Sequence, residues 1–192
     1  MLSGVSVAPE LRTERLWLRP WSATDLAPFA RLNADARVME FMPGVLSRAE
    51  SDARVADMNA QLAERGFGLW AVEVPGVAPF IGFVGLAVPR FTATFTPCVE
   101  VGWRLAAEHW GKGYATEAAR AALAFGFGTL ALHEVVSFTA VINRRSRAVM
   151  ERLGMTRDPA EDFDHPSLAA GHPLQRHVLY RIRPGQQYAD GL

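Results

Sequence analysis

The chain lacks several features that mark common classes of protein. Its 192 residues include a single cysteine, Cys98, so no intrachain disulfide can form, and this cysteine usage is compatible with the cytosol. Charge of either sign is not in excess, because 20 Lys and Arg balance 20 Asp and Glu. A net charge of zero gives no electrostatic footprint for nucleic acid or for an anionic membrane.

Long apolar runs and targeting signals are also missing. No stretch reaches the roughly eighteen uninterrupted apolar residues that a membrane span needs. The best candidate, residues 118–132, is interrupted by Arg120, Gly126 and Gly128 and is predicted to be a buried helix. The N-terminus has no basic region followed by an apolar run, so we expect no secretory signal and a cytoplasmic protein.

The length predicts one domain over residues 1–192, with residues 1–11 and 184–192 flexible. Helices are expected from Thr24 or Asp25 to about Leu32 and, after a Ser47–Glu50 capping box, to about Glu64, where Gly66 follows. Residues 157–173 are expected to form a long loop. Other predicted elements are strands at 15–20, 67–74, 80–88, 99–105, 134–141 and 174–182, and helices at 116–123 and 143–153. Strands with helices between them indicate an α/β fold with a mixed sheet.

Residues 99–123 organise the rest of the chain. Apolar residues alternate with Glu100 and Arg104 in the predicted strand 99–105, and an alanine-rich helix follows. Between the two lie Gly111 and Gly113. Glycines before a helix let backbone N–H groups approach an anion, and the helix N-terminus carries partial positive charge. We therefore expect a phosphate at this loop.

Two nucleotide-binding motifs are excluded at this loop. A Walker A loop requires Ser or Thr after its Gly-Lys, but Lys112 is followed by Gly113 and Tyr114. A dinucleotide fingerprint requires a third glycine where Thr116 stands. Taken alone, the two glycines are also compatible with an ordinary tight turn.

The stretch resembles motif A of the GNAT N-acetyltransferase superfamily, whose loop binds the pyrophosphate of acetyl-CoA. The family pattern Arg/Gln-x-x-Gly-x-Gly/Ala matches residues 108–113, although Glu108 stands at the first position. Residues 141–155, VINRRSRAVMERLGM, are similar to motif B, and residues 12–20, RTERLWLRP, are similar to the opening strand of the RimJ/RimL branch, which acetylates ribosomal proteins. The resemblance covers the chain from about Arg12 to about Ile182.

The resemblance implies the GNAT fold: a mixed, mostly antiparallel central sheet, flanked by helices, in which two central strands splay apart to admit acetyl-CoA. It implies acetyl-CoA as co-substrate and no metal. Lys112 could touch a phosphate as a point charge. For Trp110 and Tyr114, packing of the loop on the core is the simpler interpretation. The residues expected to contact CoA are Trp103, Arg104, Leu105, Trp110, Gly111, Lys112, Gly113, Tyr114, Ala115, Thr116 and Asn143.

Acetyl transfer from a thioester to an amine requires a base, a polarised carbonyl and a protonated leaving thiol. A bulged strand end at Trp103, Arg104 and Leu105 would supply a backbone N–H to the carbonyl. Glu100 is the candidate base, directly or through water, and the alternative is a solvated strand glutamate.

The predicted helix 143–153 supplies the candidate acid. In many family members a tyrosine on this helix protonates the thiolate, but Met150 stands in its place. Ser146 is the fallback acid, and the alternative is a hydroxyl bonded to the helix backbone. Asn143 is either a helix N-cap or a CoA contact as well.

The histidines do not predict a metal site, because His165, His172 and His177 match no compact ligand spacing. The segment Asp162-x-Asp164-His165-Pro166, together with residues 39–43, is expected to shape the acceptor side.

The sequence thus predicts an N-acetyltransferase acting by direct transfer in a ternary complex. The acceptor could be a protein N-terminus, a small amine or an amino sugar, and a homodimer stays open. One alternative is a non-catalytic acetyl-CoA- or CoA-binding regulatory protein of the same fold, suggested by Met150. Another is a binder of a different phosphate or nucleotide.

Overall fold

The computed structural model describes residues 9–185, and within them nine strands form one sheet. Along the sheet the strand order is β1-β2-β3-β4-β5-β6-β9-β7, with β8 also paired to β9. All pairs are antiparallel except β5 with β6. The strands are β1 (Leu11–Arg12), β2 (Trp17–Arg19), β3 (Leu69–Val74), β4 (Ala78–Ala87), β5 (Glu100–Leu105), β6 (Val135–Ala140), β7 (Thr156–Arg157), β8 (Phe163–Asp164) and β9 (Arg176–Ile182).

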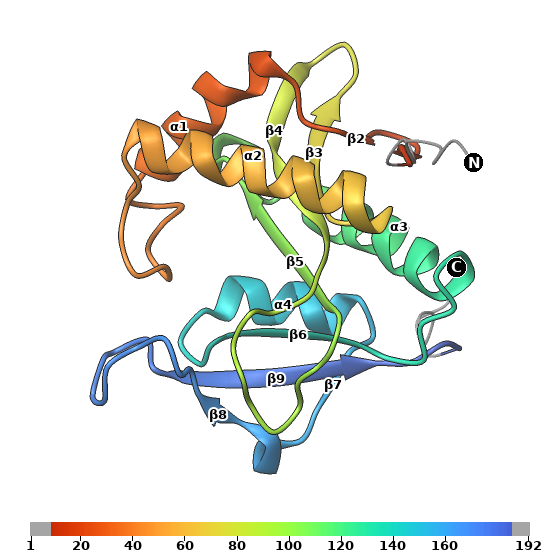
Figure 1. Cartoon of the computed structure of the whole chain (residues 1–192). Helices are drawn as coiled ribbons and strands as arrows, with labels where there is room; N and C mark the ends of the chain where they lie inside the picture. The colour runs from red at the N-terminus through yellow and green to blue at the C-terminus, as the bar shows by residue number, and fades with distance from the viewer. Residues whose placement is uncertain (1–8, 186–192) are drawn as a thin grey trace, which may run out of the picture.

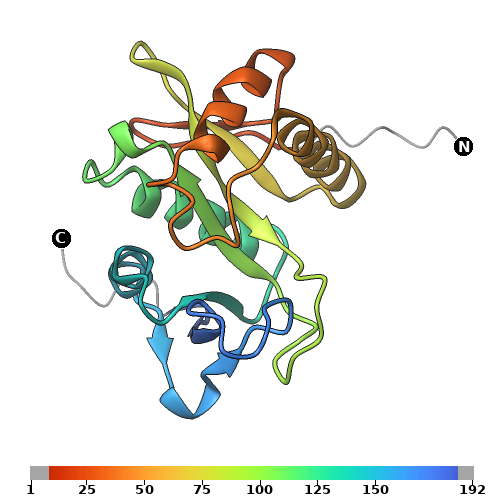
Figure 2. The same ribbon diagram turned by 90° about the vertical axis from the view of Figure 1, so that its left-hand side faces the viewer.

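Helices cover both faces of this sheet (Figure 1). Helices α1 (Leu26–Ala34) and α2 (Arg48–Arg65) lie on one face, and α3 (Tyr114–Gly128) and α4 (Arg144–Arg152) lie on the other, as Figure 2 shows from the side. Three short 3-10 turns, η1 (Ala23–Asp25), η2 (Ala107–His109) and η3 (Pro159–Glu161), link elements. The layers match the predicted α/β class, a mixed and mostly antiparallel sheet flanked by helices.

Local sequence signals set the ends of α2. The Ser47 side chain accepts a hydrogen bond from the Glu50 N–H, and the Glu50 carboxylate accepts one from the Ser47 N–H, which completes the predicted capping box. Gly66 ends the helix with a left-handed φ of 73°. The prediction of this helix is confirmed.

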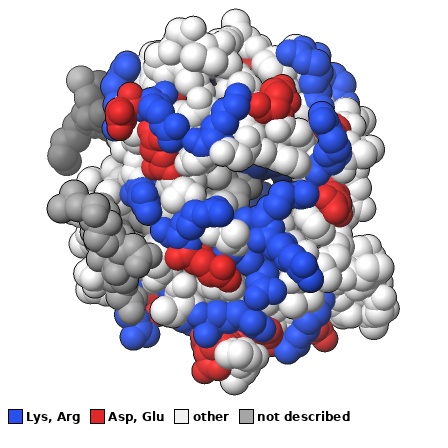
Figure 3. All heavy atoms as spheres, turned by 180° about the vertical axis from the view of Figure 1, so that it is seen from behind, with Lys and Arg blue, Asp and Glu red and all other residues white. Residues whose placement is uncertain are grey.

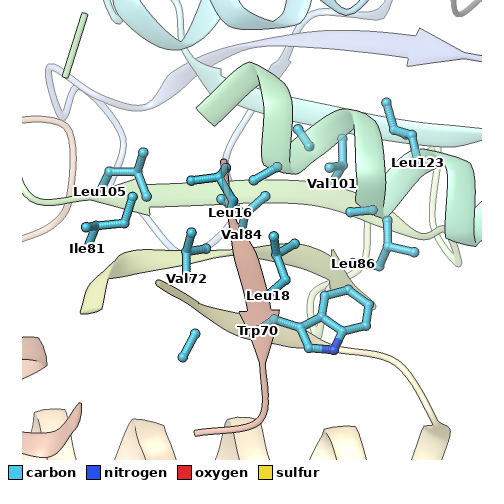
Figure 4. Close-up of a cluster of buried hydrophobic side chains, with 14 of the residues drawn as sticks. Leu16, Leu18, Trp70, Val72, Ile81, Val84, Leu86, Val101, Leu105 and Leu123 are labelled. Atoms are coloured by element: carbon cyan, nitrogen blue, oxygen red, sulfur yellow. The ribbon is translucent and has the colours of Figure 1, made fainter. Parts of the chain in front are cut away.

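The core lies mainly between the sheet and α3 (Figure 4). Trp70 on β3 is fully buried and meets Phe125 of α3 edge to face, with ring centroids 5.7 Å apart. Ala118, Ala119 and Ala122 are also fully buried, and their small side chains let α3 lie close to β4 and β5. On the opposite face, rings of Trp21, Phe29, Phe80 and Phe83 pack under α1.

The two central strands β5 and β6 separate soon after they meet. Their register consists of one pair, Glu100 with Val136, whereas β6 pairs with β9 along its whole length. Beyond that pair the Ser137 hydroxyl donates to the Val101 carbonyl at 2.9 Å, and the strands then diverge. This is the splay that the resemblance implies.

Three sequence expectations are wrong in detail. Residues 9–11, expected in a flexible end, are ordered because the Trp70 indole donates to the Pro9 carbonyl at 2.7 Å and Leu11 pairs with Leu18. Residues 1–8 and 186–192 of the predicted ends lie outside the described part. The expected loop 157–173 contains η3 and β8, which pairs with β9.

The third concerns β5, which has no bulge. It pairs with β4 in continuous register from Glu100 to Leu105, so the predicted bulge at its end is absent. None of the helices within residues 9–185 is both long enough and apolar enough to cross a membrane.

Candidate active site

A cavity of about 760 Å³ opens where β5 and β6 diverge. Its lining includes Ser146 and every residue predicted to contact CoA except Lys112. Glu100 is not part of its lining. The lining residues are Val38, Phe41, Met42, Trp103, Arg104, Leu105, His109, Trp110, Gly111, Gly113, Tyr114, Ala115, Thr116, Asn143, Arg144, Arg145, Ser146, Ala148, Val149 and Arg152.

The β6-facing edge of β5 offers backbone donors to this cavity. The carbonyls of Val99, Val101 and Leu105 accept hydrogen bonds on this edge, from Val136 N–H, the Ser137 hydroxyl and the Trp110 indole at 2.9, 2.9 and 2.8 Å. A strand residue directs its N–H and C=O to the same edge, so the N–H groups of Trp103 and Leu105 also point here. Because β6 has already diverged from β5 here, these N–H groups are not hydrogen-bonded between the two strands. The strand thus provides backbone donors without the predicted bulge.

The glycine loop leads directly into α3. Gly111 and Gly113 have φ of 73° and 81°, a region that strongly favours glycine. Gly113 is the N-cap of α3 and supplies no capping side chain, so the first N–H groups of the helix remain available to an anion. The Lys112 side chain is exposed, and it is the Lys112 carbonyl that is bound, by the Arg15 guanidinium at 3.0 Å.

Arg15 holds the glycine loop from the β1–β2 turn. Its guanidinium pairs with Glu117 of α3 at 2.5 Å and lies 4.9 Å from the centre of the Tyr114 ring. These contacts tie the loop and the first turn of α3 to the edge of the sheet. Tyr114 therefore packs as predicted and also lines the cavity.

Arginines gather on the face that carries α3 and α4, around a hollow visible from behind (Figure 3). Arg144, Arg145 and Arg152 line the cavity, and Arg15 and Arg120 line an adjoining depression that shares Gly113 and Arg152. The chain as a whole is neutral, so this is a local concentration of positive charge. Such a surface suits a polyphosphate.

Asn143 and Ser146 form a bonded pair at the start of α4. The Asn143 side chain accepts from the Ser146 N–H at 3.2 Å, which makes it the N-cap, and its amide donates to Thr139 Oγ1 and Ser146 Oγ at 3.0 and 3.1 Å. Because Ser146 Oγ accepts that bond, its own O–H is left to donate, and Ser146 lines the cavity. Met150, by contrast, is 1% exposed in the core and outside the lining.

Glu100 lies on the opposite face of β5 from the fully buried Val101, as the sequence predicts. Burial raises the pKa of the Glu100 carboxyl to about 8. No ion pair or hydrogen bond holds this carboxylate within residues 9–185. A carboxyl with a pKa near neutrality is suited to exchange protons. Since Glu100 is outside the lining, a water would link it to an acceptor in the cavity.

The segment between α1 and α2 closes one side of the cavity. Phe41 and Met42, from the segment 39–43 that is expected to shape the acceptor side, belong to its lining. Arg145 of α4 reaches across to Glu40 at 2.5 Å and lies over the rings of Phe41 and Trp110 at 5.3 and 4.7 Å. The second segment with this expected role, residues 162–166, is not in the lining: Asp162 pairs with Arg157, and Asp164 pairs with Arg176.

Several lining residues were not predicted. Arg144, Arg145 and Arg152 belong to a helix whose motif was recognised, and the run of basic residues there was the available signal. His109 also lines the cavity, and its Nδ1 is buried with no partner in the described residues. Nothing in the sequence marked it.

Two of the histidines, His165 and His177, lie together among aromatic rings. The rings of His165 and His177 have centroids 4.9 Å apart, among Phe91, Phe138 and Phe163. Burial lowers the pKa of both imidazoles. No group of three or more His, Cys, Asp or Glu side chains that could hold a metal occurs in the described part of the chain.

Known proteins of similar sequence identify the family of the chain. Residues 15–156 match the family model described as an acetyltransferase (GNAT) domain. The chain is 33% identical over 159 residues to the FsC-acetyl coenzyme A-N(2)-transacetylase of Aspergillus fumigatus, covering 79% of this chain and 67% of that protein.

Solved structures share the fold. An acetyltransferase from Agrobacterium tumefaciens is 31% identical, with a TM-score of 0.72 over 91% of this chain and 94% of that one. Mycobacterium smegmatis RimJ, solved in complex with CoA-disulfide, is 18% identical and superposes with a TM-score of 0.74 over 97% of this chain and 92% of that one, a likeness of fold. With its splayed strands, glycine loop and matched domain, the chain belongs to the GNAT acetyltransferase family, which transfers acetyl from acetyl-CoA.

Proposed function

We propose that this protein transfers acetyl directly from acetyl-CoA to a primary amine, with both substrates bound together. The observation that carries the proposal is the single cavity that joins the Gly111–Gly113 loop to Ser146 and to Arg104. The loop and its arginines suit the pyrophosphate, and the gap between β5 and β6 suits the pantetheine arm. The acceptor would enter from the side of Met42.

The chemistry then divides among residues already placed. The N–H of Trp103 donates to the thioester carbonyl and stabilises the oxyanion that forms there. Glu100 accepts, through water, the proton that the amine loses, because its raised pKa of about 8 lies close to neutral pH. The Ser146 hydroxyl donates to the departing sulfur.

Thermal unfolding in the presence of acetyl-CoA, free CoA and ATP is the first test. A ligand at about a hundred times its dissociation constant adds roughly 2.7 kcal/mol to the free energy of unfolding, which raises the melting temperature of a chain of this size by on the order of 5–10 °C. We expect a shift with acetyl-CoA and CoA but not with ATP, and release of thiol when a primary amine is added. A shift with ATP alone would contradict the proposal.

A second candidate is a CoA-binding regulator without turnover. The burial of Met150 at the place of the usual tyrosine favours it, because that route of thiol protonation is absent. The same experiment separates the two: thiol release with any amine excludes the regulator, and binding without release on a broad amine panel supports it.

A further inference from the structure

Arg104 is an arginine at the cavity whose charge no carboxylate balances. Its side chain leaves β5 on the face of α1, where Nη1 donates to Asn33 Oδ1 at 2.8 Å and Nη2 contacts Met42 Sδ at 3.0 Å. The guanidinium also lies 5.4 Å from the centre of the Phe83 ring. Both hydrogen-bond partners are neutral. Within residues 9–185 no carboxylate forms an ion pair with it.

Three other arginines on strands of the sheet are paired with carboxylates. Arg19 meets Asp25 and Glu73, Arg157 meets Asp162, and Arg181 meets Glu134 and Glu161. A charge withdrawn from water without a counter-charge is unfavourable, so an anionic ligand bound at Arg104 would offset part of this cost. Burial lowers the pKa of Arg104 to about 10, and the positive charge of Arg54 acts in the same direction.

The guanidinium keeps donors available to a guest. An arginine carries five N–H groups, and two are used by Asn33 and Met42, which leaves three. Arg104 lines the cavity, so these donors can be reached from it. A planar guanidinium of this kind suits a carboxylate or a phosphate.

Glu100 and Arg104 lie on the same face of β5, and Gly102 lies between them. A Cβ at Gly102 would meet only Glu100 Oε1 within 4 Å, at 3.6 Å, so the floor between the two charged side chains holds no other side chain within that distance. At about 3.3 Å per residue their Cα atoms are roughly 13 Å apart. An acceptor lying along this floor would have its amine toward the carboxylate and an anionic group toward the arginine.

We propose that the acceptor is a primary amine that also carries an anionic group, which Arg104 binds. The inference rests on the proposed acetyl transfer and specifies its substrate class. The anion is a carboxylate or a phosphate, since both fit the guanidinium. Neutral amines and amines whose carboxylate is blocked are then poor acceptors.

The test compares matched acceptors in a thiol-release assay with acetyl-CoA. The carboxylate pairs are 4-aminobutyrate, 6-aminohexanoate and glycylglycine against their amides, and the phosphate pair is phosphoethanolamine against ethanolamine. For wild-type protein we expect kcat/KM at least tenfold higher for the anionic member of one kind of pair. Which kind shows the preference tells carboxylate from phosphate.

Variants connect the preference to Arg104. Arg104→Gln keeps a donor for Asn33 but loses the charge. We expect the ratio of kcat/KM for the anionic acceptor to kcat/KM for its neutral counterpart to fall to within about threefold of one, mainly through a change in KM. Arg104→Lys should keep most of the preference. Arg90→Gln removes an exposed arginine that pairs with Asp57, and the ratio should not change. Melting temperature with acetyl-CoA checks that each variant folds and still binds the co-substrate.

The outcomes separate this inference from the proposed function. Equal use of anionic and neutral acceptors by wild-type protein, or an undiminished preference in Arg104→Gln, would overturn the role of Arg104 while leaving acetyl transfer intact. If no amine is acetylated, the proposed function fails instead. In that case, calorimetric titration of the same pairs into the CoA-bound protein still tests whether Arg104 binds the anionic group, because tighter binding of the anionic acceptor can be measured without turnover. Equal binding of both members of every pair would refute it.

Discussion

The pKa of Glu100 makes the pH dependence of catalysis a sharp test of its role. Burial raises the pKa of this carboxyl to about 8. An alkyl amine acceptor has a pKa of about 10.4, well separated from it. If Glu100 takes the proton of the bound ammonium ion, the productive form has an ionised Glu100 and a protonated amine. The rate should therefore rise up to about pH 8 and level off between pH 8 and pH 10.

The size of the change follows from these two values. With a pKa of about 8, the ionised fraction of Glu100 grows from about 9% at pH 7 to about 91% at pH 9, so kcat/KM should rise about tenfold. In Glu100→Gln the amine must arrive already neutral. Its neutral fraction grows about a hundredfold over the same range because its pKa is about 10.4. The variant should be slower throughout but steeper.

The assay is kcat/KM by thiol release at half-unit steps from pH 6.5 to 10, with an alkyl amine as acceptor. Melting temperatures measured at each pH show whether unfolding causes any rise or fall of kcat/KM in the pH profile. A wild-type rise of a hundredfold without a plateau near pH 8 would refute the role of Glu100. So would a plateau that persists in Glu100→Gln.

Further predictions concern the glycine loop, Ser146, the Asn143 cap of α4 and the pH dependence of the melting temperature. Gly113→Ala places a Cβ at φ 81° and 3.3 Å from Arg15, so we expect acetyl-CoA affinity to fall at least tenfold by calorimetry, whereas Gly44→Ala, which meets no atom within 4 Å, should bind normally. Ser146→Ala should slow single-turnover acetyl transfer with little effect on acetyl-CoA affinity, and unchanged turnover would remove its acid role. Asn143→Ala should lose about 1 kcal/mol of unfolding free energy, and Asn143→Asp should regain most of it, if the side chain caps α4. The pKa of Glu100 is higher in the folded state than in the unfolded chain, so its contribution to the free energy of unfolding is full below about pH 4.5 and is lost as the pH rises toward 8. The melting temperature of the wild-type protein should therefore fall over this range, and that of Glu100→Gln should fall less.

Features set by neighbouring residues could be predicted from the sequence. The capping box before α2 and the αL glycine after it involve residues a few positions apart. The same holds for the glycines before α3 and for the Asn143 cap of α4, since each is a local backbone requirement. These features locate the glycine loop and the start of α4 in the cavity.

Features that depend on distant segments could not be predicted. The partners of Arg104 are 71 and 62 positions away, so the direction of its side chain toward Asn33 and Met42 could be seen only in the fold. The contact of Arg145 with Glu40 spans 105 positions. Order at residues 9–11 depends on an indole N–H 61 positions further on, which must find a partner once Trp70 is buried.

The period of two along β5 explains how one short strand would serve both proposed substrates. Val101 and Leu105 place buried side chains toward α3, while Glu100 and Arg104 project from the other face, where we propose that the acceptor binds. The backbone of the odd-numbered positions faces the splay, where Trp103 offers its N–H to a thioester. A shift of register by one residue would direct both charges into the core and Val101 toward the acceptor. The continuous pairing of β5 with β4 therefore keeps the proposed base, the proposed anion site and the proposed backbone donor in their places.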